Sequence, residues 1–244
     1  MPDSAFIIPE SEAEFHAFVT PISDVLNRIG GQKRVLIDIG SGPGIWSLIG
    51  SKIFDRVIGL EVDDDWLPYA NKVMADNAVD NVEFLNSATQ DISQLPLADA
   101  MIAIMVLPHA RSSEVIDIFK FAAEKLDKGG TFFCMTQNPV GFFRTLFYLE
   151  RFRWEGLIKG SRRMAALFLS FMEACFSPRI RPIRRARFYQ NSRAIIDLAE
   201  QSGLELRASP KKMAQDDLFI ALSHICAPAR YSKWTVDWYL FEKT

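Results

Sequence analysis

A glycine-rich turn between two apolar runs constrains this chain more than any other feature. The run VLIDI at 35–39 is followed by the glycine turn at 40–44 and then by helical sequence from Ile45. A second apolar run occupies 57–62. A short run that is apolar on both parities predicts a strand covered on both faces of a parallel sheet. The whole stretch therefore predicts a strand, turn, helix and strand, a unit that commonly forms a nucleotide site.

Two details restrict which ligand this unit can bind. A dinucleotide fingerprint has its third glycine three positions after the second, where this chain has Ile45, whereas the glycine here is Gly44. Glu61 lies 21 positions after Gly40, where an acid meets a ribose diol in such units. Asp38 interrupts the first strand, and a buried carboxylate needs hydrogen bonds from loop amides or from a ligand. An NAD site is therefore disfavoured, while an acid suited to a ribose is present.

The segments DIGSGPG at 38–44 and IGLEV at 58–62 resemble motif I and its acidic partner in class I S-adenosylmethionine-dependent methyltransferases. The resemblance implies a Rossmann-like, doubly wound α/β fold with a seven-stranded sheet whose last strand is antiparallel. It implies S-adenosyl-L-methionine as the cofactor, with Glu61 on both ribose hydroxyls and Val62 against adenine. The residues implied to surround the methionine part are Asp38, Gly40, Ser41, Gly42 and Gly44. A Rossmann-like unit that holds NAD and a degenerate fold that holds nothing are the alternatives.

The loop after the third predicted strand, 82–85, departs from the family pattern. Its sequence NSATQDI stands where the family has a glycine-aspartate pair, and the acid that holds the adenine amine is replaced by Ala88. We expect this loop to contact the cofactor mainly through its backbone. The residues assigned to it are Ser87, Ala88, Thr89 and Asp91.

His109 is the candidate catalytic residue. It follows the predicted fourth strand, 100–106, and chemistry in open α/β sheets lies outside the carboxyl ends of the strands. Small-molecule members of the family often carry a histidine pair here, and His109 matches the second while Pro108 replaces the first. Where the acceptor is a hydroxyl, a histidine suits the role of general base. A structural histidine at the strand end is the alternative.

The other predicted elements follow the family order. One or two leading helices are expected within 11–29, divided near Pro21, and helices are expected at 65–77, 114–126 and from about 191 to 202. Strand five is expected at 131–135, after a helix end at Lys128-Gly129-Gly130, strand six at 204–208 and strand seven at 218–225. The aromatic tail beyond 230 is expected to pack back on the domain.

About fifty residues separate strand five from the following helix, many more than the ~2–6 of an ordinary connection in such folds. We therefore expect a core domain of residues 1–136 and 188–244 and a helical, basic and aromatic insertion at 137–187. Residues 151–187 alone carry a net charge of +8, against −10 for the remainder. A lid that shapes a substrate pocket is favoured, and a homodimer surface or membrane-surface docking are the alternatives. Phe143, Phe147 and Tyr189 are the candidate substrate-binding residues.

Composition restricts the partners. The net charge of −2 requires no polyanion, and no N-P-P-Y or D-P-P-Y motif of nucleobase amino methylation follows strand four, so nucleic acid is disfavoured. The three cysteines are widely spaced without a C-x-x-C pair, so no metal site is expected. A cytoplasmic protein is expected, because the first residues do not read as a secretory signal.

The sequence thus predicts methyl transfer by direct displacement to a hydrophobic small molecule or biosynthetic intermediate. The segment RFY at 187–189 resembles an element of quinone-biosynthesis-type methyltransferases. A non-catalytic cofactor-binding or scaffold protein of the same fold is one alternative. A membrane-docked lipid methyltransferase is the other.

Overall fold

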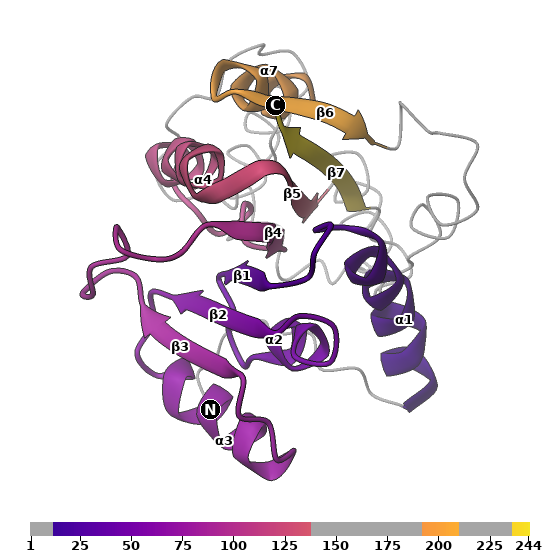
Figure 1. The fold of residues 1–244 in the computed structure, drawn as a ribbon, viewed down its shortest axis with the longest axis vertical. Helices are drawn as coiled ribbons and strands as arrows, with labels where there is room; N and C mark the ends of the chain where they lie inside the picture. The colour runs from indigo at the N-terminus through magenta and orange to yellow at the C-terminus, as the bar shows by residue number, and fades with distance from the viewer. Residues whose placement is uncertain (1–11, 138–191, 210–235) are drawn as a thin grey trace, which may run out of the picture.

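The computed structural model describes residues 12–137, 192–209 and 236–244 (Figure 1). They form a seven-stranded sheet in the order β3-β2-β1-β4-β5-β7-β6, in which β7 is antiparallel to both neighbours and the remaining pairs are parallel. The strands are β1 Val35–Ile39, β2 Arg56–Glu61, β3 Val82–Asn86, β4 Ala98–Ile104, β5 Leu126–Gln137, β6 Leu204–Ala208 and β7 Val236–Lys243. The helices are α1 Glu12–Arg28, α2 Ile45–Gly50, α3 Trp66–Asp76, α4 Ser112–Lys125 and α7 Ser192–Gln201. The predicted Rossmann-like α/β class, with a seven-stranded sheet whose last strand is antiparallel, is confirmed, while the predicted helical insertion lies almost wholly outside the described residues.

Apolar side chains cover both faces of this sheet, which explains the near-continuous apolar runs of its inner strands. On one face, α4 and α7 bury residues such as Phe119 and Ile195 against Phe132 and Phe241. On the other, α1 and α2 pack against a second cluster. Figure 1 shows α4 and α7 on one side of the sheet and α1 and α2 on the other. None of the helices in the described part of the chain has the length and apolarity to span a bilayer.

Two predicted boundaries, the division at Pro21 and the helix end at Lys128-Gly129-Gly130, are not found in the structure. The leading segment is a single helix that continues through Pro21, so no division occurs there. Helix α4 ends at Lys125, and the Lys128-Gly129-Gly130 step lies inside β5, where the pairing with β4 shifts register between Ala98 and Ala100. Gly129 has a φ of 76°, which a glycine adopts without the cost of a side chain, so the step forms an irregular strand instead of a helix end.

The strand between β5 and β6 is also not where the sequence predicts it. It is formed by the C-terminal segment Val236–Lys243, and the predicted range 218–225 lies outside the described residues. The tail does pack back on the domain, as expected, but it does so as a strand paired on both sides.

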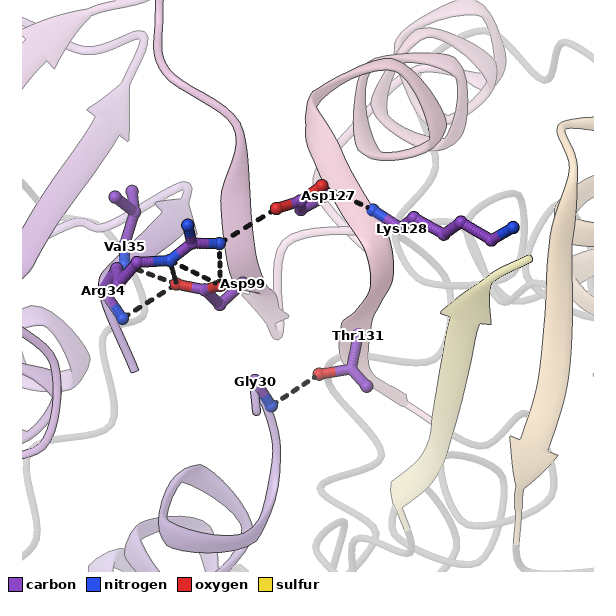
Figure 2. A network of polar contacts seen from close by, with 7 residues as sticks. All are labelled: Gly30, Arg34, Val35, Asp99, Asp127, Lys128 and Thr131. Carbon is purple, nitrogen blue, oxygen red and sulfur yellow. Dashed lines mark hydrogen bonds and ion pairs between the residues drawn. The ribbon is translucent and has the colours of Figure 1, made fainter. Parts of the chain in front are cut away.

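A polar network joins the amino ends of β1, β4 and β5 (Figure 2). The Asp99 carboxylate accepts hydrogen bonds from the backbone N–H groups of Arg34 and Val35, at 2.8 and 3.0 Å, and from the Arg34 guanidinium at 2.7 Å. The same guanidinium donates to Asp127 at 2.9 Å. One arginine therefore fastens three strands at the edge opposite to their carboxyl ends.

The order of the strands fixes where a ligand can bind. From β1 the chain continues outward through β2 and β3, and it then returns to the other side of β1 to form β4 and β5. Ligands of open α/β sheets bind outside the carboxyl ends of the strands at this reversal. The segments that follow β1, β2, β3 and β4 are therefore the ones to inspect.

Candidate functional site

The glycine turn leads from β1 into α2 and is hydrogen-bonded to the end of β2. The N–H groups of Gly40 and Ser41 both donate to the carbonyl of Leu60, at 2.7 and 3.0 Å. Gly40 and Gly44 have φ angles of 67° and 81°, in the left-handed region that favours glycine. The turn follows β1, as the sequence predicts, and it lies across the carboxyl ends of β1 and β2.

Close packing adds a second requirement for glycine in this turn. A Cβ atom at Gly40 would lie 2.5 Å from Cγ2 of Val106, and one at Gly44 would lie 2.9 Å from the ring of Phe84. Val106 follows β4, so the turn is held between the loop after β4 and strand β3. The sequence gives no sign of the contact with Val106, because the two residues are distant in the chain.

Glu61 connects β2 to the glycine turn. Its side chain is 8 % exposed, and Oε2 accepts a hydrogen bond from the N–H of Gly42 at 2.8 Å. Oε1 accepts from the N–H groups of Val62 and Asp63, at 2.8 and 3.2 Å. Since a carboxylate oxygen can accept about two hydrogen bonds, Oε2 retains capacity for a ligand hydroxyl. The neighbouring Val62 side chain is 66 % exposed.

Asp38 lies at the end of β1 and is 1 % exposed. Oδ2 accepts a hydrogen bond from the Ser47 hydroxyl at 2.7 Å, whereas Oδ1 has no hydrogen-bond partner among the described residues. The hydroxyl of Ser41, also buried, has none either. Burial raises the pKa of Asp38 to about 7, and the nearby charge of Glu61 adds to this effect while Ser47 opposes it. Two unmatched buried polar groups beside a glycine turn indicate a site for a polar, cationic ligand group.

The loop after β3 lies against the loop after β2. The Ser87 N–H donates to the carbonyl of Glu61 at 2.8 Å. The Asn86 side chain accepts hydrogen bonds from the N–H groups of Ala88 and Thr89, at 2.8 and 3.2 Å, and donates to Asp64 at 2.5 Å. Sequence reasoning missed this role of Asn86, although a polar residue that ends an apolar strand was a usable signal.

Asp91 lies further along the same loop and has a local role there. Its carboxylate accepts a hydrogen bond from the N–H of Ser93 at 2.8 Å. Hydrogen bonds from Ser93 hold the pKa of Asp91 below its usual value. The geometry thus ties Asp91 to its own loop. Ser87 is hydrogen-bonded directly to Glu61, and Ala88 and Thr89 are hydrogen-bonded to Asn86.

The segment after β4 brings His109 to the same edge of the sheet. Met105 has a φ of 61°, unusual for a residue with a side chain, and its N–H donates to the Met135 carbonyl at 2.8 Å. The chain turns away from the sheet at this point, so that Val106 covers Gly40. The His109 N–H donates to the Val106 carbonyl at 2.9 Å, and its side chain is exposed. His109 is therefore in the loop that covers the glycine turn.

Several predicted residues fall outside the described part of the chain. They are Phe143, Phe147 and Tyr189, together with nearly all of the predicted insertion at 137–187. Among the residues that the structure describes, no group of three or more His, Cys, Asp or Glu side chains is arranged to hold a metal ion.

Comparison with protein families gives a match for most of the chain. Residues 15–209 match the family model described as a methyltransferase domain. No curated protein matches the sequence.

Solved structures show the same fold at low sequence identity. Magnesium protoporphyrin IX methyltransferase from Synechocystis, solved with bound SAH, is 13% identical with a TM-score of 0.57, and the match covers 98% of this chain and 90% of that one. PKMT2 from Rickettsia typhi, in complex with AdoHcy, is 13% identical with a TM-score of 0.59, over 94% of this chain and 54% of that one. The [4+2]-cyclase SpnF is 12% identical with a TM-score of 0.55, over 91% and 79%.

Proposed function

This chain belongs to the methyltransferase-domain family and is an S-adenosylmethionine-dependent methyltransferase, and we propose that its acceptor is a hydrophobic small molecule or biosynthetic intermediate. The observation that supports the donor site most strongly is the pair of unmatched buried groups, Asp38 Oδ1 and Ser41 Oγ, beside a glycine turn fastened to Glu61. S-Adenosylmethionine carries an ammonium group and a ribose diol, which have counterparts among these residues, and an adenine ring, whose proposed counterpart is Val62.

In this proposal the ammonium group of the cofactor lies at Asp38 and Ser41, and the main chain of Gly40, Gly42 and Gly44 follows its methionine part. Glu61 accepts hydrogen bonds from the ribose hydroxyls, and the exposed Val62 side chain covers one face of adenine. The backbone of Ser87, Ala88 and Thr89, with Asp91 beyond them, borders the adenine ring. When bound, the cofactor supplies an activated methyl group, so the chain's main task is alignment of the acceptor and exclusion of water.

His109 is the proposed general base. It follows β4 at the carboxyl edge, in the loop whose Val106 side chain covers Gly40. A hydroxyl acceptor must lose a proton as it attacks, and an imidazole with a pKa near neutrality can accept it. An acceptor that is already anionic needs no base, and His109 is then structural.

The acceptor is proposed to be hydrophobic because of the insertion at 137–187, which separates two parts of the core domain, 1–136 and 188–244. Phe143, Phe147 and Tyr189 are the residues proposed to line the acceptor pocket. A lid is the preferred role, while a homodimer surface or docking on an anionic membrane, as in a lipid methyltransferase, would use the same aromatic and basic residues. Nucleic acid is the least favoured partner, and the cytoplasm is the proposed location.

A thermal shift experiment tests the donor site. A ligand at a hundred times its Kd adds ~2.7 kcal/mol to the free energy of unfolding, which raises Tm by roughly 5–10 °C in a chain of this size. We expect this shift with S-adenosylhomocysteine and none with NAD. Glu61→Ala should abolish it, whereas Asp65→Ala, at an exposed neighbouring carboxylate, should retain it. No shift in the unmodified protein would contradict the donor assignment.

A second measurement separates catalysis from binding alone. The cyclase SpnF has this fold and is named for a different reaction, so the fold does not by itself require methyl transfer. Purified protein should be incubated with S-adenosylmethionine and a panel of hydrophobic metabolites, and the release of S-adenosylhomocysteine measured. Binding of the donor without release on any acceptor would favour a scaffold protein. Sedimentation with anionic and neutral vesicles would identify a membrane-docked enzyme.

A further inference from the structure

Two buried polar residues lie opposite each other at the carboxyl end of β5, outside the proposed donor site. Thr136 is the penultimate residue of β5 and is paired in register with Asp237 of β7. Thr136 is 0 % exposed and Asp237 is 9 % exposed. Directly opposed residues of antiparallel strands point to the same face with Cβ atoms ~4.5–5.5 Å apart. The two side chains are therefore neighbours.

Their hydrogen bonding is incomplete at one position. Oγ1 of Thr136 is fully buried and has no hydrogen-bond partner in the described structure. The hydroxyl of Tyr239, on the same face of β7, donates to Oδ2 of Asp237 at 3.4 Å. A buried hydroxyl without a partner is rare and calls for an explanation, and an adjacent carboxylate makes a ligand group one explanation.

The ends of the strands place this pair beside the proposed reaction site. Pairing of β4 with β5 ends at Ile104 and Met135, one residue before Thr136, because the chain leaves the sheet at Met105. Pairing of β5 with β7 continues to Gln137 and Val236. Thr136 and Asp237 thus extend past the end of β4, on the side of the His109 loop that faces away from β1.

The distance to the donor side follows from the sheet order β1-β4-β5-β7. Neighbouring strands are ~4.8 Å apart, so Thr136 is about two strand spacings from Asp38 and Asp237 about three. That separation, on the order of 10–14 Å, suits a group that anchors the far end of an acceptor whose reacting atom lies near His109.

A hydroxyl group is the ligand chemistry that fits both residues. A carboxylate only accepts hydrogen bonds, whereas a threonine hydroxyl can also donate one. A ligand hydroxyl can donate to Asp237 and accept from Thr136 at the same time, and so it pairs with both. An ammonium group can donate to both residues but cannot accept the Thr136 proton, whereas a hydroxyl group both donates and accepts; a methyl group does neither.

We propose that Thr136 and Asp237 form a subsite that binds a hydroxyl group of the acceptor and thereby selects hydroxylated apolar molecules. This inference rests on the proposed function, because it presumes that the acceptor binds at the carboxyl ends of β4 and β5. The bound hydroxyl is a recognition group, separate from the atom that is methylated. Tyr239 positions the carboxylate of Asp237.

Matched probes test the subsite without knowledge of the natural acceptor. Equilibrium dialysis against protein saturated with S-adenosylhomocysteine should use pairs that differ in one group, such as 2-naphthol with 2-methylnaphthalene and 4-tert-butylphenol with 4-tert-butyltoluene. We expect the protein to prefer the hydroxyl member of at least one pair by about 10-fold, as for one hydrogen bond to a charged group. Thr136→Val and Asp237→Asn should each reduce this preference to about 2-fold or less.

Thr131→Val is the matched control. Thr131 is on the same strand at the opposite edge, where its hydroxyl accepts a hydrogen bond from the Gly30 N–H at 3.1 Å (Figure 2). Its replacement should lower Tm and leave the preference unchanged. Thr136→Val should reduce the preference without lowering Tm, because the hydroxyl that it removes has no partner in the described structure.

The outcomes separate this inference from the proposed function. If S-adenosylhomocysteine raises Tm in the unmodified protein and in both variants, but no probe pair shows a hydroxyl preference, the subsite is wrong and the donor site stands. A preference that persists in both Thr136→Val and Asp237→Asn also overturns the subsite. If the unmodified protein shows no shift with S-adenosylhomocysteine, the proposed function itself has failed.

Discussion

Asp38 has one carboxylate oxygen bonded to Ser47 and the other without a described partner, and its burial raises its pKa from 3.8 to about 7. In the unfolded chain it titrates near the ordinary value. Between these two pKa values the folded protein holds a proton that the unfolded chain has lost. The stability that this proton contributes is fully present below the unfolded pKa and is lost as pH rises through the folded pKa.

We therefore predict that the free energy of unfolding falls between about pH 4 and pH 7, by at most ~1.4 kcal/mol per pH unit from this group. Asp38→Asn, which has the same shape and does not titrate, should lack this contribution. Urea unfolding of both proteins at pH 5, 6, 7 and 8 measures the difference. Parallel pH profiles for the two proteins would show that Asp38 is ionised throughout, contrary to the prediction.

His109 provides the second prediction at this scale. If it is the base, His109→Ala should reduce the methylation rate by ~10²–10⁴-fold, with little change in the affinity for S-adenosylhomocysteine. The rate of the unmodified protein should decrease at pH values below the pKa of the imidazole. The residual rate of the variant should not show this pH dependence. A near-normal rate in His109→Ala would make the residue structural.

Some residues of the proposed site can be predicted from the sequence and others cannot. The positions of Asp38, Gly40 and Glu61 followed from local spacing, because the turn joins consecutive elements. Val106 and Asp237 did not, because their importance comes from neighbours that are distant in the chain, Gly40 and Thr136. Local patterns identify the donor side, whereas contacts between distant segments determine the rest.

Among the elements, the amino ends of β1, β4 and β5 depend on the Asp99 carboxylate. It is nearly buried and accepts backbone hydrogen bonds from Arg34 and Val35 as well as the guanidinium of Arg34 (Figure 2). Asp99→Asn places an amide where only an acceptor fits. We predict a loss of ~2 kcal/mol in the free energy of unfolding, or roughly 5 °C in Tm.

Asp127→Asn is the control for this prediction. Asp127 accepts from the same guanidinium, but its side chain is 40% exposed, and exposed ion pairs contribute little. Its replacement should cost less than ~1 kcal/mol in the free energy of unfolding. Both variants should bind S-adenosylhomocysteine normally, because the network lies at the edge opposite to the donor site. Equal losses in the two variants would mean that the backbone hydrogen bonds to Asp99 are unimportant.

The elements were predicted unevenly, for physical reasons. β1, β6 and the start of α2 were predicted at their observed residues, because a short apolar run next to a glycine or a cap has a clear boundary. β7 was missed because its sequence VDWYLFEK looks like an aromatic tail, and only its two neighbours make it a strand. A strand buried between two others has no strict alternation to reveal it.

For the whole molecule, the two sides of the sheet are assembled differently. β1, β2 and β3, which carry the proposed donor site, come from one continuous stretch of chain. The other side combines β4 and β5 with β6 and with the final segment of the chain. Completion of the proposed acceptor side, with Asp237 opposite Thr136, therefore requires the last strand to be in place.

A truncated protein tests this dependence. β7 supplies Trp238, Tyr239 and Phe241, each at most 1 % exposed, and loss of one such side chain costs ~3–5 kcal/mol. The whole stability of a domain is only ~5–15 kcal/mol, so removal of residues 236–244 should abolish cooperative unfolding and the shift with S-adenosylhomocysteine. Removal of Thr244 alone, which follows the strand, should change neither. Cooperative unfolding of the truncated protein would show that β5 and β6 are stable without the strand between them.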